Sequence, residues 1–180
     1  AAVVAAAQAK GLPLLEDNPY GDLWFDAPPP PSLASRWPQG VLYLGSFSKV
    51  LAPGLRLGYI VSPAALYPKL LQAKQAADLH TSSFNQYVAY EVGKGGFLDE
   101  HVKVIRATYK ERRDVMLEMM EEMFPPEASW THPLGGMFLW GMMPEGVDAA
   151  EVLKVALDRK VAFVPGTAFH PNGGGQNTMR

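Results

Sequence analysis

The sequence predicts an α/β fold, and three observations predict it. Three apolar runs among the first 62 of the 180 residues, at 12–16, 41–48 and 55–62, have the length and composition of buried strands. Amphipathic helical patterns follow these runs, and the longest pattern covers 97–124. After it the order strand, helix, strand returns, which indicates a second, smaller α+β unit.

The first part of the chain alternates between apolar runs and turns. The Ala-rich opening is expected to be the end of a helix, with Gly11 as its stop. LPLLED predicts a buried strand whose carboxyl end carries Asp17, and NPYGD predicts a turn. The proline stretch DAPPPPS is typical of a stiff surface loop, which we favour over a polyproline recognition segment. The strands VLYLGSFS and LRLGYIVS follow.

Three helices are expected in the middle of the chain. The first has Ser62 as its N-cap and Pro63 at its first position, and the second covers 83–92. The third is the long 97–124 pattern, which Pro125 ends. We expect its methionines to pack in the core rather than to form an adaptable binding face. These methionines are Met116, Met119 and Met123.

The C-terminal residues predict a compact series of short elements. ASWTHPLGGMFLWGMM has the pattern of a strand, a Gly turn and a second strand. A short helix is expected after Asp148, whose spacing to Glu151 is that of a capping box. VAFVPGTAF is expected to be a strand that leads into a turn.

The composition argues against several classes of function. Sixteen basic and 18 acidic residues give a net charge of −2, so no nucleic-acid partner is expected for this chain. The chain has no cysteine, which excludes disulfides and thiol catalysis, and its four histidines are scattered, so no metal site is expected. No apolar run reaches the length of a membrane span and no signal peptide is recognisable. We therefore expect a cytoplasmic protein.

The stretch GSFSKVLAPGLRLGY concentrates the candidate chemistry. Ser46 to Lys49 fits the S-x-x-K pattern of serine nucleophiles, but here the serine ends a strand and Pro53 interrupts any following helix. The partner motifs S-D-N and K-T-G are also absent, so we set that interpretation aside. A partly desolvated lysine at a strand end favours its amine form, which can attack a carbonyl and form a Schiff base.

An aldehyde cofactor with a phosphate tail would need hydroxyls and a cation beside such a lysine. These groups are available in Ser46, Ser48 and Arg56. A pyridine cofactor would also need a carboxylate at its ring nitrogen, which Asp17 could supply, and Tyr20 could hydrogen-bond its phenolic oxygen. Each residue alone has an ordinary explanation, such as a solvated lysine or a turn acid. Their combination and spacing favour the site.

Five motifs in order carry a family resemblance: EDNPYGDL, YLGSFSKVLAPGLRLGY, GGMFLW, VPGTAF and NTMR. Together they resemble the fold-type I pyridoxal-phosphate-dependent aminotransferases of class I/II, in the branch of 2-aminoadipate and kynurenine-type enzymes. The resemblance implies pyridoxal 5'-phosphate as cofactor and transfer of an amino group between an amino acid and a 2-oxo acid. The implied amino acids are 2-aminoadipate and aromatic or large aliphatic ones, with 2-oxoglutarate as acceptor.

The resemblance also implies roles for individual residues. Lys49 matches the lysine that forms the Schiff base and later moves the substrate proton, Asp17 matches the carboxylate at the pyridine nitrogen, and Tyr20 matches the phenol. Arg180 matches the arginine that pairs with the substrate α-carboxylate. Residues 80–86 match a region near the neighbouring subunit's cofactor. The phosphate cradle is matched by Ser46, Ser48 and Arg56.

A domain order follows from the same resemblance. Residues 1–96 would be the C-terminal half of a large, mostly parallel-sheet cofactor domain, 97–123 a linking helix, and 124–180 an incomplete small domain. The chain lacks a starting Met and ends just after a Gly-rich loop, so we expect a fragment, inactive alone, of a homodimeric protein. The alternative is the aminotransferase-like effector domain of a winged-helix transcription regulator, which EDNPYG and GGMFLW make less favoured.

Overall fold

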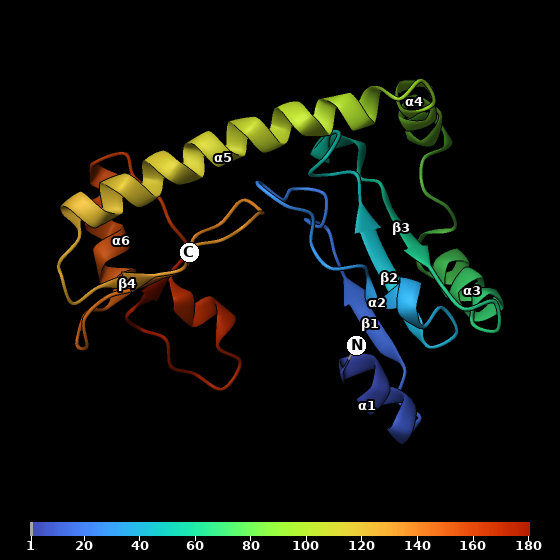
Figure 1. Ribbon diagram of the computed structural model, residues 1–180, viewed down its shortest axis with the longest axis horizontal. Coiled ribbons are helices and arrows are strands. Elements are labelled where there is room, and N and C mark those ends of the chain that lie inside the picture. Colours follow the sequence, from blue (N-terminus) through green and yellow to red (C-terminus); the bar gives the residue numbers. More distant parts are fainter. Residues whose placement is uncertain (1) are drawn as a thin grey trace. The chain divides into compact units, whose positions relative to one another are not determined.

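The computed structural model describes residues 2–180, and they form two compact units (Figure 1). The first unit ends at Ala107, and the second runs from Thr108 to Arg180. The long helix α5 (Phe97–Met123) contributes residues to both. Among the residues described, no helix is both long enough and apolar enough to cross a bilayer.

A three-stranded sheet with the order β1-β2-β3 forms the centre of the first unit (Figure 1). β1 (Leu14–Asp17) pairs in parallel with β2 (Val41–Ser46), and β2 pairs antiparallel with β3 (Gly58–Val61). β2 and β3 fall within their predicted apolar runs, whereas β1 begins two residues after the start of its run and ends one residue beyond it, at Asp17. Each strand is shorter than its run. One of the two pairings is therefore parallel, as expected for a fold with crossover connections.

The burial predicted for the strands is only partly correct. Val41 at the start of β2 and Leu23 in the turn after β1 are fully buried. β3, in contrast, is exposed along its whole length. The prediction of a buried third strand is therefore wrong for this chain, because β2 is the one described element that packs extensively against β3.

The sequence predicts some of the helices around this sheet well and misses another. α1 (Ala2–Lys10) ends as expected at Gly11, whose φ is +63°. α4 (Ser83–Gly93) also agrees with the prediction, and the Ser82 hydroxyl caps it by accepting a hydrogen bond from the Asn85 N–H. A short helix that was not expected, α2 (Leu33–Arg36), follows the proline stretch.

The predicted start of the next helix is wrong. α3 (Tyr67–Asp78) begins five residues after Ser62, and Leu66 occupies the N-cap position without a capping side chain. The Leu66 N–H donates instead to the Pro63 carbonyl, which makes residues 63–66 a separate turn. Pro68 in the first turn of α3 supplies the N-terminal proline that Pro63 was expected to supply.

The second unit contains a small antiparallel sheet of three two-residue strands. These are β4 (Ser129–Trp130), β5 (Gly141–Met142) and β6 (Thr178–Met179), in that order. The predicted pair of strands around a Gly turn corresponds to β4 and β5. β5 also pairs with β6, which brings the C-terminal residues into the sheet.

Two details of the second unit differ from the prediction. α6 (Ala149–Asp158) is capped by Asp148, but the Glu151 carboxylate bonds to Lys154 and so the capping box forms only in part. VAFVPGTAF is not a regular strand. Val164 exchanges backbone hydrogen bonds with Arg180, and the 3-10 helix η2 (Gly166–Phe169) then begins directly after Pro165.

The methionines of α5 are mostly not core residues in this chain. The exposed fractions of Met116, Met119 and Met123 are 55%, 39% and 72%. Met120, which the sequence analysis did not single out, is the buried one and lies close to Gly141 of β5. The expectation of core packing is therefore wrong for the three methionines named above.

Candidate active site

The carboxyl ends of β1 and β2 bring two candidate segments to one edge of the sheet. The two strands are parallel, and their pairing runs from Leu14 with Val41 to Asp17 with Leu44. The Asn18 N–H continues this ladder by donating to the Leu44 carbonyl over 3.0 Å. Residues after β1 and after β2 therefore leave the sheet side by side, at the edge where α/β proteins place their ligands.

Asp17 and Ser46 lie on the same face of this sheet. Paired residues on neighbouring strands share a face, and every second residue of a strand returns to it. Asp17 pairs with Leu44, and Ser46 is two residues beyond Leu44. The Asp17 carboxylate and the Ser46 hydroxyl therefore project from one face, whereas Glu16 belongs to the other face and caps α2 through the Leu33 and Ala34 N–H groups.

Lys49 lies on the turn that follows β2. The Leu51 and Ala52 N–H groups both donate to the Phe47 carbonyl, over 2.9 and 3.1 Å, and close this turn. The Lys49 amine lies 5.9 Å from the centroid of the Tyr20 ring. Both side chains are half-buried. The structure thus brings together a lysine and a tyrosine that are 29 positions apart in the sequence.

The two serines stabilise the backbone that presents Lys49. The Ser46 hydroxyl accepts a hydrogen bond from the Ser48 N–H over 3.1 Å and lies 3.5 Å from the Leu57 carbonyl, to which it donates. Leu57 is buried and directly precedes β3. Ser46 therefore links the end of β2 to the start of β3.

Arg56 is an exposed cation on a constrained backbone. It follows the 3-10 turn η1 (Pro53–Leu55) in the left-handed region, with φ of 53°, a conformation that is unusual for a residue other than glycine. Its guanidinium donates to the Pro53 carbonyl over 3.2 Å. The Asn85 amide donates to the neighbouring Leu55 carbonyl over 3.0 Å, which ties α4 to this turn.

A pair of tyrosines lies on the opposite face of the sheet, and the sequence analysis did not identify it. The Asn18 amide donates to the Tyr43 hydroxyl over 3.2 Å, and the Tyr43 and Tyr59 rings stack at 6.3 Å with 28° between their planes. A side chain at Gly45 would overlap the Tyr59 ring. Tyr59 is 42% exposed, and the partial burial of its phenol raises its pKa, which the nearby Tyr43 and Asp22 raise further.

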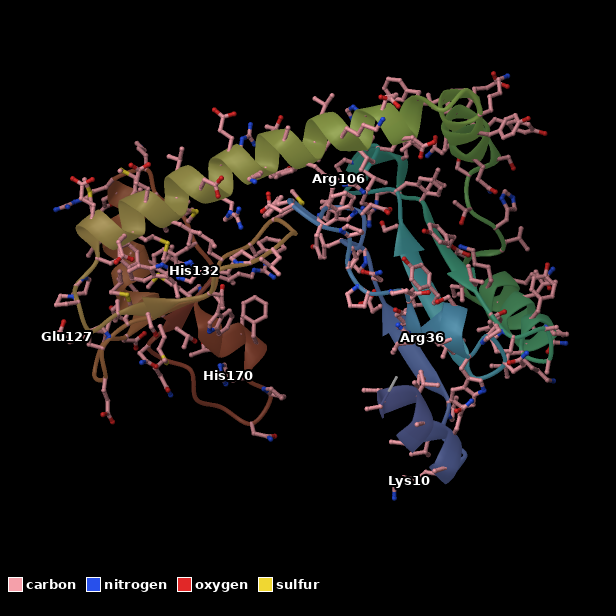
Figure 2. All side chains as sticks on the ribbon, in the orientation of Figure 1. Lys10, Arg36, Arg106, Glu127, His132 and His170 are labelled. Carbon is pink, nitrogen blue, oxygen red and sulfur yellow. The ribbon has the colours of Figure 1, made fainter. Side chains whose placement is uncertain are left out.

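Arg106 fixes the segment that follows Tyr20, and it too was missed. Figure 2 labels this side chain on the first half of α5. Its guanidinium carbon lies 3.8 Å from the centroid of the Trp24 ring, and its Nε donates to the Asp22 carbonyl over 2.6 Å. These partners are more than 80 positions away in the sequence, so no local pattern could have predicted them.

Arg180 belongs to the second unit and lies beside two aromatic rings. Its guanidinium carbon is 4.1 Å from the centroid of Phe138 and 4.5 Å from that of Phe169. Its backbone exchanges hydrogen bonds with Val164 in both directions, at 2.8 and 2.9 Å. The structure thus defines the local surroundings of Arg180 within its own unit.

The sequence matches a known family along its whole length. The family model described as aminotransferase class I and II covers residues 1–180. The chain belongs to this family. In the part of the chain that the structure describes, no three histidine, aspartate or glutamate residues are grouped so that they could hold a metal ion.

Two similar relatives are named as aminotransferases. Aromatic-amino-acid aminotransferase 1 of Thermococcus litoralis is 45% identical over 93% of this chain, which corresponds to 40% of that protein. The 2-aminoadipate transaminase of Thermus thermophilus is 44% identical over 95% of this chain and 44% of its own length. The chain therefore spans less than half the length of these curated relatives.

Solved aminotransferase structures share the fold of this chain. The α-aminoadipate aminotransferase of Thermus thermophilus, solved with N-(5'-phosphopyridoxyl)-L-leucine, has a TM-score of 0.93 and 42% identity, over 99% of this chain and 46% of that one. The kynurenine aminotransferase of Pyrococcus horikoshii also has a TM-score of 0.93, with 41% identity over 99% of this chain and 45% of that one.

Relatives of another kind are similar to the same residues. A helix-turn-helix transcriptional regulator of Bacillus subtilis, named YisV and uncharacterised, is 32% identical over 99% of this chain and 37% of its own length. The likeness thus extends to proteins that are named as regulators rather than enzymes.

Proposed function

We propose that the protein is an aminotransferase that binds pyridoxal 5'-phosphate and moves an amino group between an amino acid and a 2-oxo acid. The observation that carries the proposal is the contact of the Lys49 amine with the Tyr20 ring at the edge of the sheet. Asp17 and Ser46 project from one face at this edge. The similar enzymes of Thermococcus litoralis and Thermus thermophilus are named for the same reaction, which supports the proposal.

The donor groups at this edge fit such a cofactor chemically. An amine, a phenol and a carboxylate, in Lys49, Tyr20 and Asp17, suit the aldehyde, the phenolic oxygen and the ring nitrogen of pyridoxal phosphate. Hydroxyl and guanidinium groups suit its phosphate. We assign these phosphate contacts to Ser46, Ser48 and Arg56. When bound, the cofactor supplies an electron sink for the substrate carbon that loses its proton.

Each residue then has a defined task. The Lys49 Nζ would take the proton from the substrate carbon as a general base. It would then deliver that proton to the cofactor carbon as a general acid. The Tyr20 ring limits the positions open to that amine, because its centroid lies 5.9 Å from it. Asp17 keeps a proton at the ring nitrogen through its negative charge. Arg180 binds the α-carboxylate of the amino acid.

The substrate range, location and assembly belong to the same proposal. We assign 2-aminoadipate and aromatic or large aliphatic amino acids as donors and 2-oxoglutarate as acceptor. Two similar relatives are named for aromatic amino acids and for 2-aminoadipate, which supports these two donors. We further propose a cytoplasmic homodimer, with residues 1–96 in a cofactor domain, 97–123 as a linking helix and 124–180 in a small domain. The 180-residue chain alone is expected to have little activity.

Amino transfer by the full gene product tests this function. With pyridoxal phosphate, 2-aminoadipate or leucine and 2-oxoglutarate, we expect glutamate to form. Lys49→Ala should lower the rate by a factor of roughly 10³ or more, since it removes the proton-transferring amine. Lys10→Arg, at the exposed end of α1, is the matched control and should leave the rate unchanged. Equal rates for Lys49→Ala and the unchanged protein would contradict the proposal.

A second candidate function is the effector domain of a transcription regulator. The similarity to the Bacillus subtilis regulator over 99% of this chain favours it. The two functions differ in what the full gene product does. A regulator would contain a winged-helix segment and would bind duplex DNA with an affinity that falls steeply with salt. The enzyme would instead form glutamate as described above.

A further inference from the structure

The aromatic surroundings of Arg180 lead to an inference about how the substrate is held. We propose that Phe138 and Phe169 are positioning residues for Arg180: their ring faces hold the guanidinium so that its N–H groups receive the carboxylate of the substrate. This inference rests on the proposed function, because it needs Arg180 to bind a carboxylate. It assigns a task to two residues that the sequence analysis did not connect with the site.

The backbone of Arg180 is fixed before its side chain is considered. Arg180 directly follows β6, and its N–H and carbonyl bond to the carbonyl and N–H of Val164. The preceding Met179 forms a bridge with Pro165 and pairs with Gly141 of β5. The Cα of Arg180 is therefore held between two segments, which leaves the long side chain as the flexible part.

Phe169 is placed by the packing of η2 against β6. Gly166, the first residue of η2, is buried, and a side chain there would overlap the Thr178 hydroxyl. The Trp140 ring lies 5.5 Å from Phe169 at 74°, an edge-on contact that aromatic pairs favour. His170, labelled in Figure 2 beside η2, lies 6.2 Å from Trp140. Phe169 is thus held by its contact with Trp140 and by the packing of η2 against β6.

The chemistry of the contact suits a guanidinium that must bind an anion. A planar guanidinium stacks on aromatic faces and keeps its five N–H donors in its own plane. Aromatic faces attract a cation without accepting those donors in ordinary hydrogen bonds. Among residues 2–180, no carboxylate forms an ion pair with Arg180. The rings therefore hold the cation while its N–H groups are available to a ligand.

The exposure of the cluster agrees with a ligand site rather than a core. The exposed fractions of Phe138 and Phe169 are 42% and 41%. A contact of this kind stabilises a cation more strongly once water is displaced from it. Binding of the substrate should therefore strengthen the contact of the rings with Arg180.

Equilibrium binding of a simple carboxylate to the full gene product, loaded with pyridoxal phosphate, tests the inference. The probe is 4-methylpentanoate, which has the carbon chain and carboxylate of leucine but no amine, and its uncharged amide is the comparison. We expect Phe138→Leu and Phe169→Leu each to lower the binding affinity for 4-methylpentanoate by roughly 3- to 30-fold, which corresponds to the loss of one cation–π contact. The affinity for the amide should not change.

Three control variants separate a ring-face effect from general damage. Phe138→Tyr and Phe169→Tyr keep the ring face and should retain the affinity for the acid. Phe124→Leu removes a ring of the same unit that stacks edge-on with Trp130 and does not contact Arg180, so it should have no effect. When Arg180→Ala is already present, adding Phe138→Leu should not lower the affinity for the acid further, because the rings act through the guanidinium.

Two results would overturn the inference, and they have different meanings. If Arg180→Ala abolishes the preference for the acid whereas both Phe→Leu variants keep it, the rings have no positioning role and the proposed function stands. If the unchanged protein binds acid and amide equally well, Arg180 does not bind the carboxylate, and both the inference and that part of the proposed function fail.

Discussion

At the scale of single residues, the candidate site depends on contacts between residues far apart in the chain. The sequence suggests Lys49 and Tyr20 as members of one site, both from what a pyridine aldehyde cofactor would need and from the resemblance to a family. The structure gives a physical reason for their contact: β1 and β2 end at the same edge, and each side chain follows one of these ends three residues later. Asp17 and Ser46 share a face because the register pairs Asp17 with Leu44.

Tyr59 is expected to make the stability of the protein depend on pH at alkaline values. Partial burial of the phenol and the neighbouring Tyr43 raise its pKa above the ordinary value of 10.0, so the folded protein keeps this proton more tightly than the unfolded chain does. The resulting stabilisation is fully present below pH 10.0 and is lost as the pH rises through the folded pKa. The Tyr59→Phe variant has no phenol at this position that could ionise, so it should lack this part of the pH dependence of the unfolding free energy.

Urea denaturation at pH 8 and at pH 11 measures this effect. The loss of unfolding free energy between the two pH values should be smaller for Tyr59→Phe than for the unchanged protein, because the phenol whose pKa is raised by folding has been removed. Tyr67→Phe, at an exposed tyrosine on α3, is the matched control and should behave like the unchanged protein. The same loss in all three proteins would rule out a raised pKa at Tyr59.

At the scale of elements, the sequence predicts which helices and strands exist better than it predicts where they begin and end or how deeply they are buried. The three strands, α1, α4, α5 and α6 are predicted because their apolar periods and stop signals are local. The start of α3 is wrong because two prolines compete for the same role, and the local sequence does not decide between Pro63 and Pro68. The exposure of β3 depends on what packs against it, which no local pattern contains.

The packing of the Tyr59 ring of β3 on β2 depends on the small size of residue 45. The Tyr59 ring lies over Gly45, so an added methyl group would overlap it. Gly45→Ala is therefore expected to destabilise the protein by about 1–3 kcal/mol, as overpacking does. Gly54→Ala is the control, since nothing lies within 4 Å of its added methyl group, and it should change stability little. Urea denaturation of the two variants side by side measures the difference, and equal stability would contradict this packing.

The contact of α5 with the segment after β1 depends on Arg106. Arg106→Met removes the hydrogen bond to the Asp22 carbonyl and the contact with Trp24, and we expect a loss of about 1–2 kcal/mol. Lys103→Met lies one turn away and removes only an exposed ion pair with Glu100, so its effect should stay within about 0.5 kcal/mol. Thermal unfolding of both variants measures the difference in stability. If Lys103→Met lowers the stability as much as Arg106→Met does, the contacts of Arg106 have no specific stabilising role.

At the scale of the whole molecule, the chain covers 40–46% of the similar proteins described above. Its two units each present candidate groups, with Lys49 in the first and Arg180 in the second. Sequence patterns and family resemblance supplied the residues to which we assign chemistry in the proposed function. They could not identify the supporting residues, such as Asn18, Tyr43, Arg106 and Phe138, because the importance of these residues lies in contacts made only after folding.

The central claim is that Lys49 is the residue that reacts with the cofactor. Reduction of the full gene product with borohydride in the presence of pyridoxal phosphate, followed by peptide mapping, tests it most directly. We predict a single pyridoxyl group attached to Lys49, and no attachment to any peptide in Lys49→Ala. Attachment elsewhere in the unchanged protein, or none at all, would contradict the account and leave an aminotransferase fold with a different task.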